Sequence, residues 1–109
     1  MSATGVKSLL FSQFARVSQA LASGNRLELL EFLAQGERSV DALAKLSGLS
    51  VANTSRHLQV LRQAGLVQAR KEGQFVYYSV SGGGVIKLLA ALQEVAEHNV
   101  AEVTRLVHE

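Results

Sequence analysis

The 109-residue chain contains no cysteine and no proline. The absence of cysteine excludes a disulfide, a thiolate metal site and a thiol switch. Without proline, helix ends depend on glycine and serine. No apolar run approaches the roughly 20 residues that span a bilayer, and the start of the sequence lacks a signal-peptide pattern. We therefore expect a cytoplasmic protein with no membrane partner, folded as one domain over residues 1–109.

Charge is distributed unevenly along the chain, although the net charge is only +2. Residues 1–37 are balanced, whereas residues 38–84 carry six basic residues against two acidic ones, and residues 85–109 are net negative. A basic middle between neutral and acidic ends is the distribution expected of a protein that offers one surface to phosphates.

Residues 40–63 have the pattern of two helices joined by a tight turn. The turn, Ser47-Gly48-Leu49-Ser50, combines a glycine suited to a left-handed helix exit with a serine able to cap the next helix. Apolar residues recur at helical spacing on both sides of it, at Val40, Leu43, Ala44, Leu46, Val51, Leu58 and Leu61. Helices joined so closely must cross, which leaves the opposite face of the second helix free.

That free face carries polar side chains that can hydrogen-bond base edges in a major groove. Arg56 suits guanine, and Asn53 or Gln59 suits adenine. Polar residues on a helix often do no more than face water. Here the turn before the helix and the hairpin after it favour DNA recognition.

A basic hairpin is predicted after Gly65. Residues 66–71 and 74–80 have strand character and flank Glu72-Gly73, which suits a hairpin turn. Its tip contains Arg70, Lys71 and Gln74, so it can lie along the DNA backbone or enter the minor groove. The alternative is an ordinary solvated hairpin.

Three further helices are expected: one over residues 6–22, one ending at Gln35-Gly36, and one over residues 84–107 after a glycine run. The apolar stripe of the last helix exceeds what a small core can cover. We therefore predict a homodimer formed through residues 6–22 and 84–107, whose two-fold axis would match a palindromic DNA site. The alternative is that this stripe covers its own domain.

Several segments together resemble the ArsR/SmtB family of winged-helix repressors: residues 21–23, 25–30, 49–50, the run SRHLQVLRQAGLV at 55–67, RKEG at 70–73 and VYY at 76–78. The resemblance implies a mainly α fold with a small β-hairpin, a winged helix-turn-helix of about five helices plus a two-stranded wing. It also implies a dimeric repressor that binds operator DNA and is released by an inducer. The implied DNA-facing residues are Ser50, Asn53, Ser55, Arg56, His57, Gln59, Arg70, Lys71 and Gln74.

The metal sites implied by this family are disrupted here. A Cys-x-Cys pair on the helix before the turn would fall at Ser39 and Asp41, neither of which is a soft ligand. One zinc-binding pair would fall at Gly82 and Gly84, and the second near Glu94 and Glu97. We therefore expect no metal and no cofactor. Glu94, Glu97, His98, Glu102 and His108 leave a carboxylate–imidazole site open, since Glu94 and His98 are four residues apart, but a solvated acidic face with a surface histidine is the ordinary explanation.

Two alternatives for function remain. A winged-helix domain can serve as a protein-interaction module, which the basic segment disfavours without excluding. An enzyme is not expected, because the chain lacks a cysteine nucleophile, a G-x-S-x-G elbow and a phosphate-binding glycine loop.

The sequence also resembles the N-terminal domain of family members that carry a rhodanese-like sulfurtransferase domain after it. In such a protein, sensing would reside in a part outside these 109 residues. No residue identifies the inducer.

Overall fold

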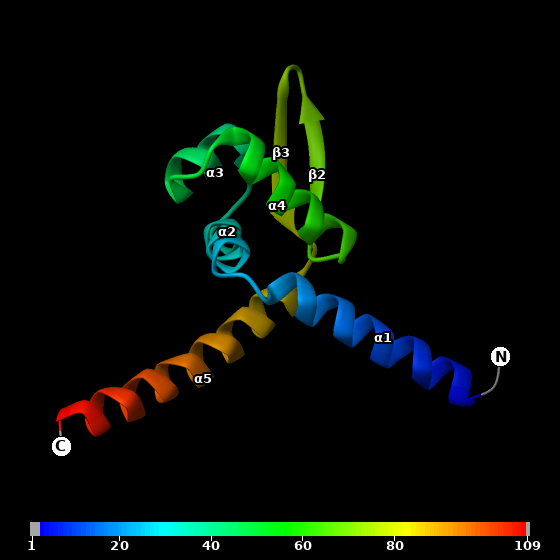
Figure 1. The fold of residues 1–109 in the computed structure, drawn as a ribbon. Helices are drawn as coiled ribbons and strands as arrows, with labels where there is room; N and C mark the ends of the chain where they lie inside the picture. Colours follow the sequence, from blue (N-terminus) through cyan, green and yellow to red (C-terminus); the bar gives the residue numbers. More distant parts are fainter. Residues whose placement is uncertain (1–2, 109) are drawn as a thin grey trace.

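A computed structural model describes residues 3–108 of the chain (Figure 1). Its elements are α1 (Ala3–Leu21), α2 (Gly24–Ala34), β1 (Arg38–Ser39), α3 (Val40–Ser47), α4 (Val51–Gln63), β2 (Val67–Glu72), β3 (Phe75–Val80) and α5 (Gly83–His108). Five helices and a small antiparallel sheet confirm the expected winged helix-turn-helix fold. The first and last helices begin slightly earlier than the sequence patterns indicated.

The turn between α3 and α4 has the predicted geometry. Gly48 ends α3 in the left-handed region, with φ of 73°, and its N–H donates to the Ala44 carbonyl over 3.0 Å. Ser50 caps α4 by accepting a hydrogen bond from the Asn53 backbone N–H at 3.1 Å. The two caps fix where one helix stops and the next begins, and thus how α4 crosses α3.

The sheet has one strand more than the sequence indicated. Its order is β1-β3-β2, and all pairs are antiparallel. In β1, Arg38 pairs with Tyr78 and Ser39 pairs with Tyr77. Two residues carry no alternating pattern, so β1 could not be recognised locally. It ties the segment before α3 to the wing, which is the hairpin of β2, β3 and their turn.

The turn of the wing lies one residue later than predicted. Glu72 pairs with Phe75, so the two turn residues are Gly73 and Gln74 rather than Glu72 and Gly73. Gly73 has φ of 60°, and no residue other than glycine has positive φ among residues 3–108. Positive φ at the first turn position only is the pattern of a type II′ turn, in which glycine is favoured.

The core lies between α2, α3, α4 and the sheet. Its fully buried side chains are mostly leucines, including Leu29, Leu30, Leu43, Leu58 and Leu61. In contrast, α1 and α5 project from this body as two arms (Figure 1), and we call these two helices the arms. The arms contact the core only near their attached ends, through residues such as Ala20 and Leu89.

Candidate nucleic-acid interface

The face of α4 that points away from the core carries the residues predicted to read DNA. Thr54, Leu58 and Leu61 bury one side of the helix. On the other side, Asn53 and Arg56 are exposed. Arg56 makes no hydrogen bond or ion pair recorded for residues 3–108, so its guanidinium donors are available to a ligand.

The remaining predicted residues of α4 have different surroundings. Ser50 already uses its hydroxyl oxygen as the helix cap, which leaves its hydroxyl hydrogen as a donor. Ser55 and His57 are half-buried at the margin of the exposed face. Gln59 is exposed, and its Nε2 donates to the Tyr78 hydroxyl at 3.4 Å, a long hydrogen bond that a better acceptor can replace.

A groove separates α4 from the wing. It has a volume of about 350 Å³ and is lined from α4 by Ser55, Gln59 and Arg62, and from the wing by Ala69, Arg70, Lys71, Val76 and Tyr78, with Val40 at its edge. Three of these side chains are cationic. We call the exposed face of α4, this groove and the wing tip together the reading face.

Arg70 is held by acidic residues within the protein. Its Nε lies 3.0 and 2.9 Å from the two carboxylate oxygens of Glu37, and its Nη2 lies 2.7 Å from one of them. Its Nη1 donates to Glu72 at 2.6 Å, and the guanidinium carbon lies 4.7 Å from the centre of the Tyr77 ring. These contacts lower the pKa of the Glu37 carboxyl and raise that of the Arg70 guanidinium, chiefly through their shared hydrogen bonds.

The Glu37 pair changes the charge balance inferred from the sequence. Glu37 precedes the basic segment 38–84, yet β1 brings it beside the wing, 33 residues away from Arg70 in sequence. Two carboxylates thus offset the charge of Arg70 in the protein alone. Lys71 and Gln74 at the tip are exposed and belong to no ion pair recorded among residues 3–108. No local pattern signals this pairing.

Comparison with known proteins places this arrangement in a family. Residues 23–69 match the model of the bacterial regulatory proteins of the arsR family. This chain is 45% identical to the homodimeric winged helix-turn-helix DNA-binding domain of Mb0332 from Mycobacterium bovis. Its fold matches the solution structure of that domain with a TM-score of 0.81. That alignment covers 89% of this chain and 88% of the other, and its protein is described as a possible ArsR-family transcriptional regulator. This chain belongs to the ArsR family.

Two curated relatives support the assignment. The HTH-type transcriptional regulator Rv0324 of Mycobacterium tuberculosis (strain ATCC 25618 / H37Rv) is 46% identical over 89% of this chain and 43% of its own length. The transcriptional repressor SmtB homolog of Synechocystis sp. (strain ATCC 27184 / PCC 6803 / Kazusa) is 38% identical over 79% of this chain and 63% of its own length. The ArsR-family chain thus spans less than two thirds of the length of either relative, and both are transcriptional regulators by name.

Two of the positions where the family has metal ligands, Ser39 and Asp41, have structural roles in this ArsR-family chain. Ser39 was expected within the helix before the turn; it lies in β1 and caps α3, accepting from the Ala42 N–H at 3.1 Å. Asp41 lies in the first turn of α3, where a carboxylate favours the helix dipole. Within residues 3–108, no three histidine, aspartate or glutamate side chains are grouped as metal ligands would be, and Glu94 and His98 have no third partner.

The arms of this ArsR-family chain carry the exposed apolar surface that the sequence pattern predicted for a dimer. On α1, Leu9, Leu10 and Phe14 are about half exposed, and on α5 most apolar residues from Val95 onward are more than half exposed. Among the described residues of α5, Leu89 alone is buried. No helix within the described residues combines the length and hydropathy needed to cross a membrane.

Proposed function

We propose that this chain is a dimeric, sequence-specific DNA-binding regulator of transcription, acting in the cytoplasm as a repressor that an inducer releases from a palindromic operator. The observation that carries the proposal is the reading face. A capped helix with exposed Asn53 and Arg56 lies beside a basic wing, in a chain of the ArsR family. The Synechocystis relative is named a transcriptional repressor, which supports repression, whereas HlyU of Vibrio cholerae, also 38% identical, is named a transcriptional activator.

Recognition is divided between bases and backbone. Arg56 donates two hydrogen bonds to a guanine, while Asn53 and Gln59 pair with adenine in the major groove. Ser50, Ser55 and His57, near the helix N-terminus and its margin, contact phosphates, as do Lys71 and Gln74 in the wing. Arg70 joins them once a phosphate replaces Glu37 as its partner.

Dimerisation uses the two arms. We propose that each chain is a single winged helix-turn-helix domain. Its residues 6–22 and 84–107 cover the same residues of a second copy. Apolar surface of this extent is typical of protein interfaces. The homodimeric state of the Mb0332 domain supports this assembly. A two-fold axis would separate the two copies of α4 by about one DNA turn, roughly 34 Å.

The test is a titration by fluorescence anisotropy of the purified protein. The probes are the DNA upstream of its own gene and a scrambled duplex of equal length and composition, at two salt concentrations, with and without zinc. We expect tight binding to the upstream duplex alone, weakening with salt and indifferent to zinc. Equal weak binding to both duplexes would overturn sequence-specific recognition at that site and favour a protein-interaction module.

A further inference from the structure

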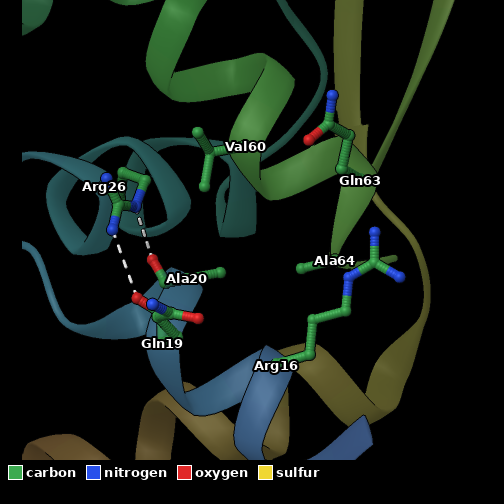
Figure 2. A pocket seen from close by; sticks show the side chains of 7 residues that line it. All are labelled: Arg16, Gln19, Ala20, Arg26, Val60, Gln63 and Ala64. Carbon is green, nitrogen blue, oxygen red and sulfur yellow. Dashed lines mark hydrogen bonds between the residues drawn. The ribbon is translucent and has the colours of Figure 1, made fainter.

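A second pocket lies outside the reading face, between α1, the start of α2 and the end of α4 (Figure 2). We call it the junction pocket. Its volume is about 320 Å³, which is at the lower end of the range of small-molecule sites. Its lining consists of Arg16, Gln19, Ala20, Arg26, Val60, Gln63 and Ala64. None of these residues belongs to the predicted DNA-contacting set.

The lining contains two arginines and no acidic residue. Arg26 donates from Nε to the Ala20 carbonyl at 2.6 Å and from Nη2 to the Gln19 carbonyl at 3.2 Å, which closes the end of α1. Its Nη1 makes no hydrogen bond recorded for residues 3–108. Arg16 makes none at all within the same residues, and its side chain extends from α1 toward Ala64 (Figure 2).

The helix ends that border the pocket offset only part of the positive charge of Arg16 and Arg26. The C-terminal ends of α1 and α4 both border the pocket, at Ala20 and Ala64, and a helix C-terminus acts as roughly half a negative charge. Two helix ends therefore offset only part of the positive charge of the two guanidinium groups. The pocket keeps a positive charge that suits an anionic ligand.

The other lining groups restrict the ligand further. Ala20, Val60 and Ala64 supply small apolar surface, and the amide side chains of Gln19 and Gln63 supply neutral hydrogen-bonding groups. We propose that the junction pocket binds a small organic acid that has a single carboxylate and a short apolar body. Arg16 holds the carboxylate through charge-assisted hydrogen bonds, while the guanidinium of Arg26 lies on the opposite side of the pocket (Figure 2) and adds to its positive charge.

The position of the pocket connects ligand binding to DNA binding. It lies where the last turns of an arm meet the end of α4, and α1 contacts the core only near there. A ligand that changes the angle between α1 and α4 would change the distance between the two copies of α4 in a dimer. This consequence, unlike binding itself, rests on the proposed function.

Binding is tested by ¹H–¹⁵N NMR on the DNA-free protein with three probes of equal chain length: hexanoate, hexan-1-ol and hexylammonium. We expect saturable shifts with hexanoate alone, centred on the amides of Gln19, Arg26 and Ala64. Arg16→Gln should weaken hexanoate binding about tenfold or more, because a charged hydrogen-bonding partner is lost. The control Lys7→Gln removes one charge from the same exposed helix and should leave the affinity unchanged within about twofold.

Equal binding of hexan-1-ol, or unchanged hexanoate affinity in Arg16→Gln, would overturn the proposal. Loss of affinity for the scrambled duplex in Arg16→Gln, with no hexanoate binding to the unaltered protein, would assign the arginines to DNA phosphates instead. Because these measurements need no operator, a failure of the junction pocket is distinguishable from a failure of the DNA-binding proposal.

Discussion

The body of this protein, formed by α2, α3, α4 and the sheet, fully or partly buries most of its large apolar side chains, whereas the arms leave most of theirs exposed. In α4, Leu58 and Leu61 are 0% exposed, while polar side chains occupy the outer face. In α5, Val100 is 64% and Leu106 is 65% exposed. Both helices are amphipathic, so the difference lies in what one chain can cover. The body is stable through contacts within the chain, whereas the arms are suited to contacts with a second chain.

The largest effect is expected from a cavity in the body. Leu58→Ala should lower the free energy of unfolding by about 2–5 kcal/mol, because the side chain is fully buried among the core leucines. Urea denaturation at fixed protein concentration measures this. Val51→Ala, half exposed on the same helix, is the control and should change it by less than about 1 kcal/mol. Equal losses in both variants would refute the distinction between the two faces of α4.

A charge placed on an arm should separate the copies without unfolding the body. Phe14 is 51% exposed on α1 and packs edge-on against Phe11. Phe14→Glu should weaken dimerisation by about 2 kcal/mol or more, roughly thirtyfold, because an aromatic contact becomes a charge in an apolar interface. Analytical ultracentrifugation measures the dissociation constant. Gln13→Glu adds the same charge beside it and should have a small effect; a dimer that tolerated Phe14→Glu equally well would exclude this face.

On the reading face, Arg56→Ala should remove discrimination between operator and scrambled DNA. The expected loss is about 1–3 kcal/mol, the contribution of a bidentate arginine–guanine contact. Anisotropy with both duplexes measures it. Arg105→Ala removes an equal charge from α5, where Arg105 pairs with Glu102, and should leave discrimination intact. Full discrimination in Arg56→Ala would remove this residue from the reading set.

Freeing Arg70 from Glu37 should have a smaller effect on DNA binding, and it should raise the affinity rather than lower it. Glu37→Gln removes one of the two carboxylates that hold Arg70 in the free protein and leaves Glu72 in place. We expect affinity for the scrambled duplex to rise about two- to threefold, with a steeper salt dependence, since one more cation becomes available to phosphates. Glu28→Gln makes the same charge change on the exposed side of α2. An equal gain in both variants would attribute the effect to net charge alone.

Low pH should break the same ion pair, between Glu37 and Arg70, and its effect on stability should be the smallest of these effects. The pKa of the Glu37 carboxyl is lower in the folded protein than its ordinary value of 4.5. Its contribution to stability is therefore complete above pH 4.5 and is lost as pH falls through the lower folded value. The Nε–H signal of Arg70 in NMR spectra should shift over that range. No shift between pH 5 and pH 2.5 would show that the pair is absent in solution.

The sequence predicted features that local chemistry determines. Gly48 and Ser50 define the helix turn because left-handed backbone and helix capping each depend on one residue type. Periodicity likewise located the buried face of α4. The β1 strand could not be predicted, because two residues carry no periodicity and pair with β3 only after the chain folds.

The ion pair between Glu37 and Arg70 was missed for the same reason. A count of charges by segment assigned Glu37 to the neutral N-terminal part, whereas the fold places it against the wing. The junction pocket has an equivalent origin, since Arg16, Arg26 and Val60 come from three different helices. Features built from distant segments depend on tertiary structure and leave no short pattern in the sequence.

In the proposed division of labour, the body reads DNA while the arms join two copies of the chain. Sedimentation velocity of the protein with its labelled upstream duplex, at saturating protein and moderate salt, tests both roles together. We expect two chains per duplex for the unaltered protein, and loss of that complex in Phe14→Glu at concentrations where the body remains folded. A single chain bound per duplex with undiminished affinity would contradict it.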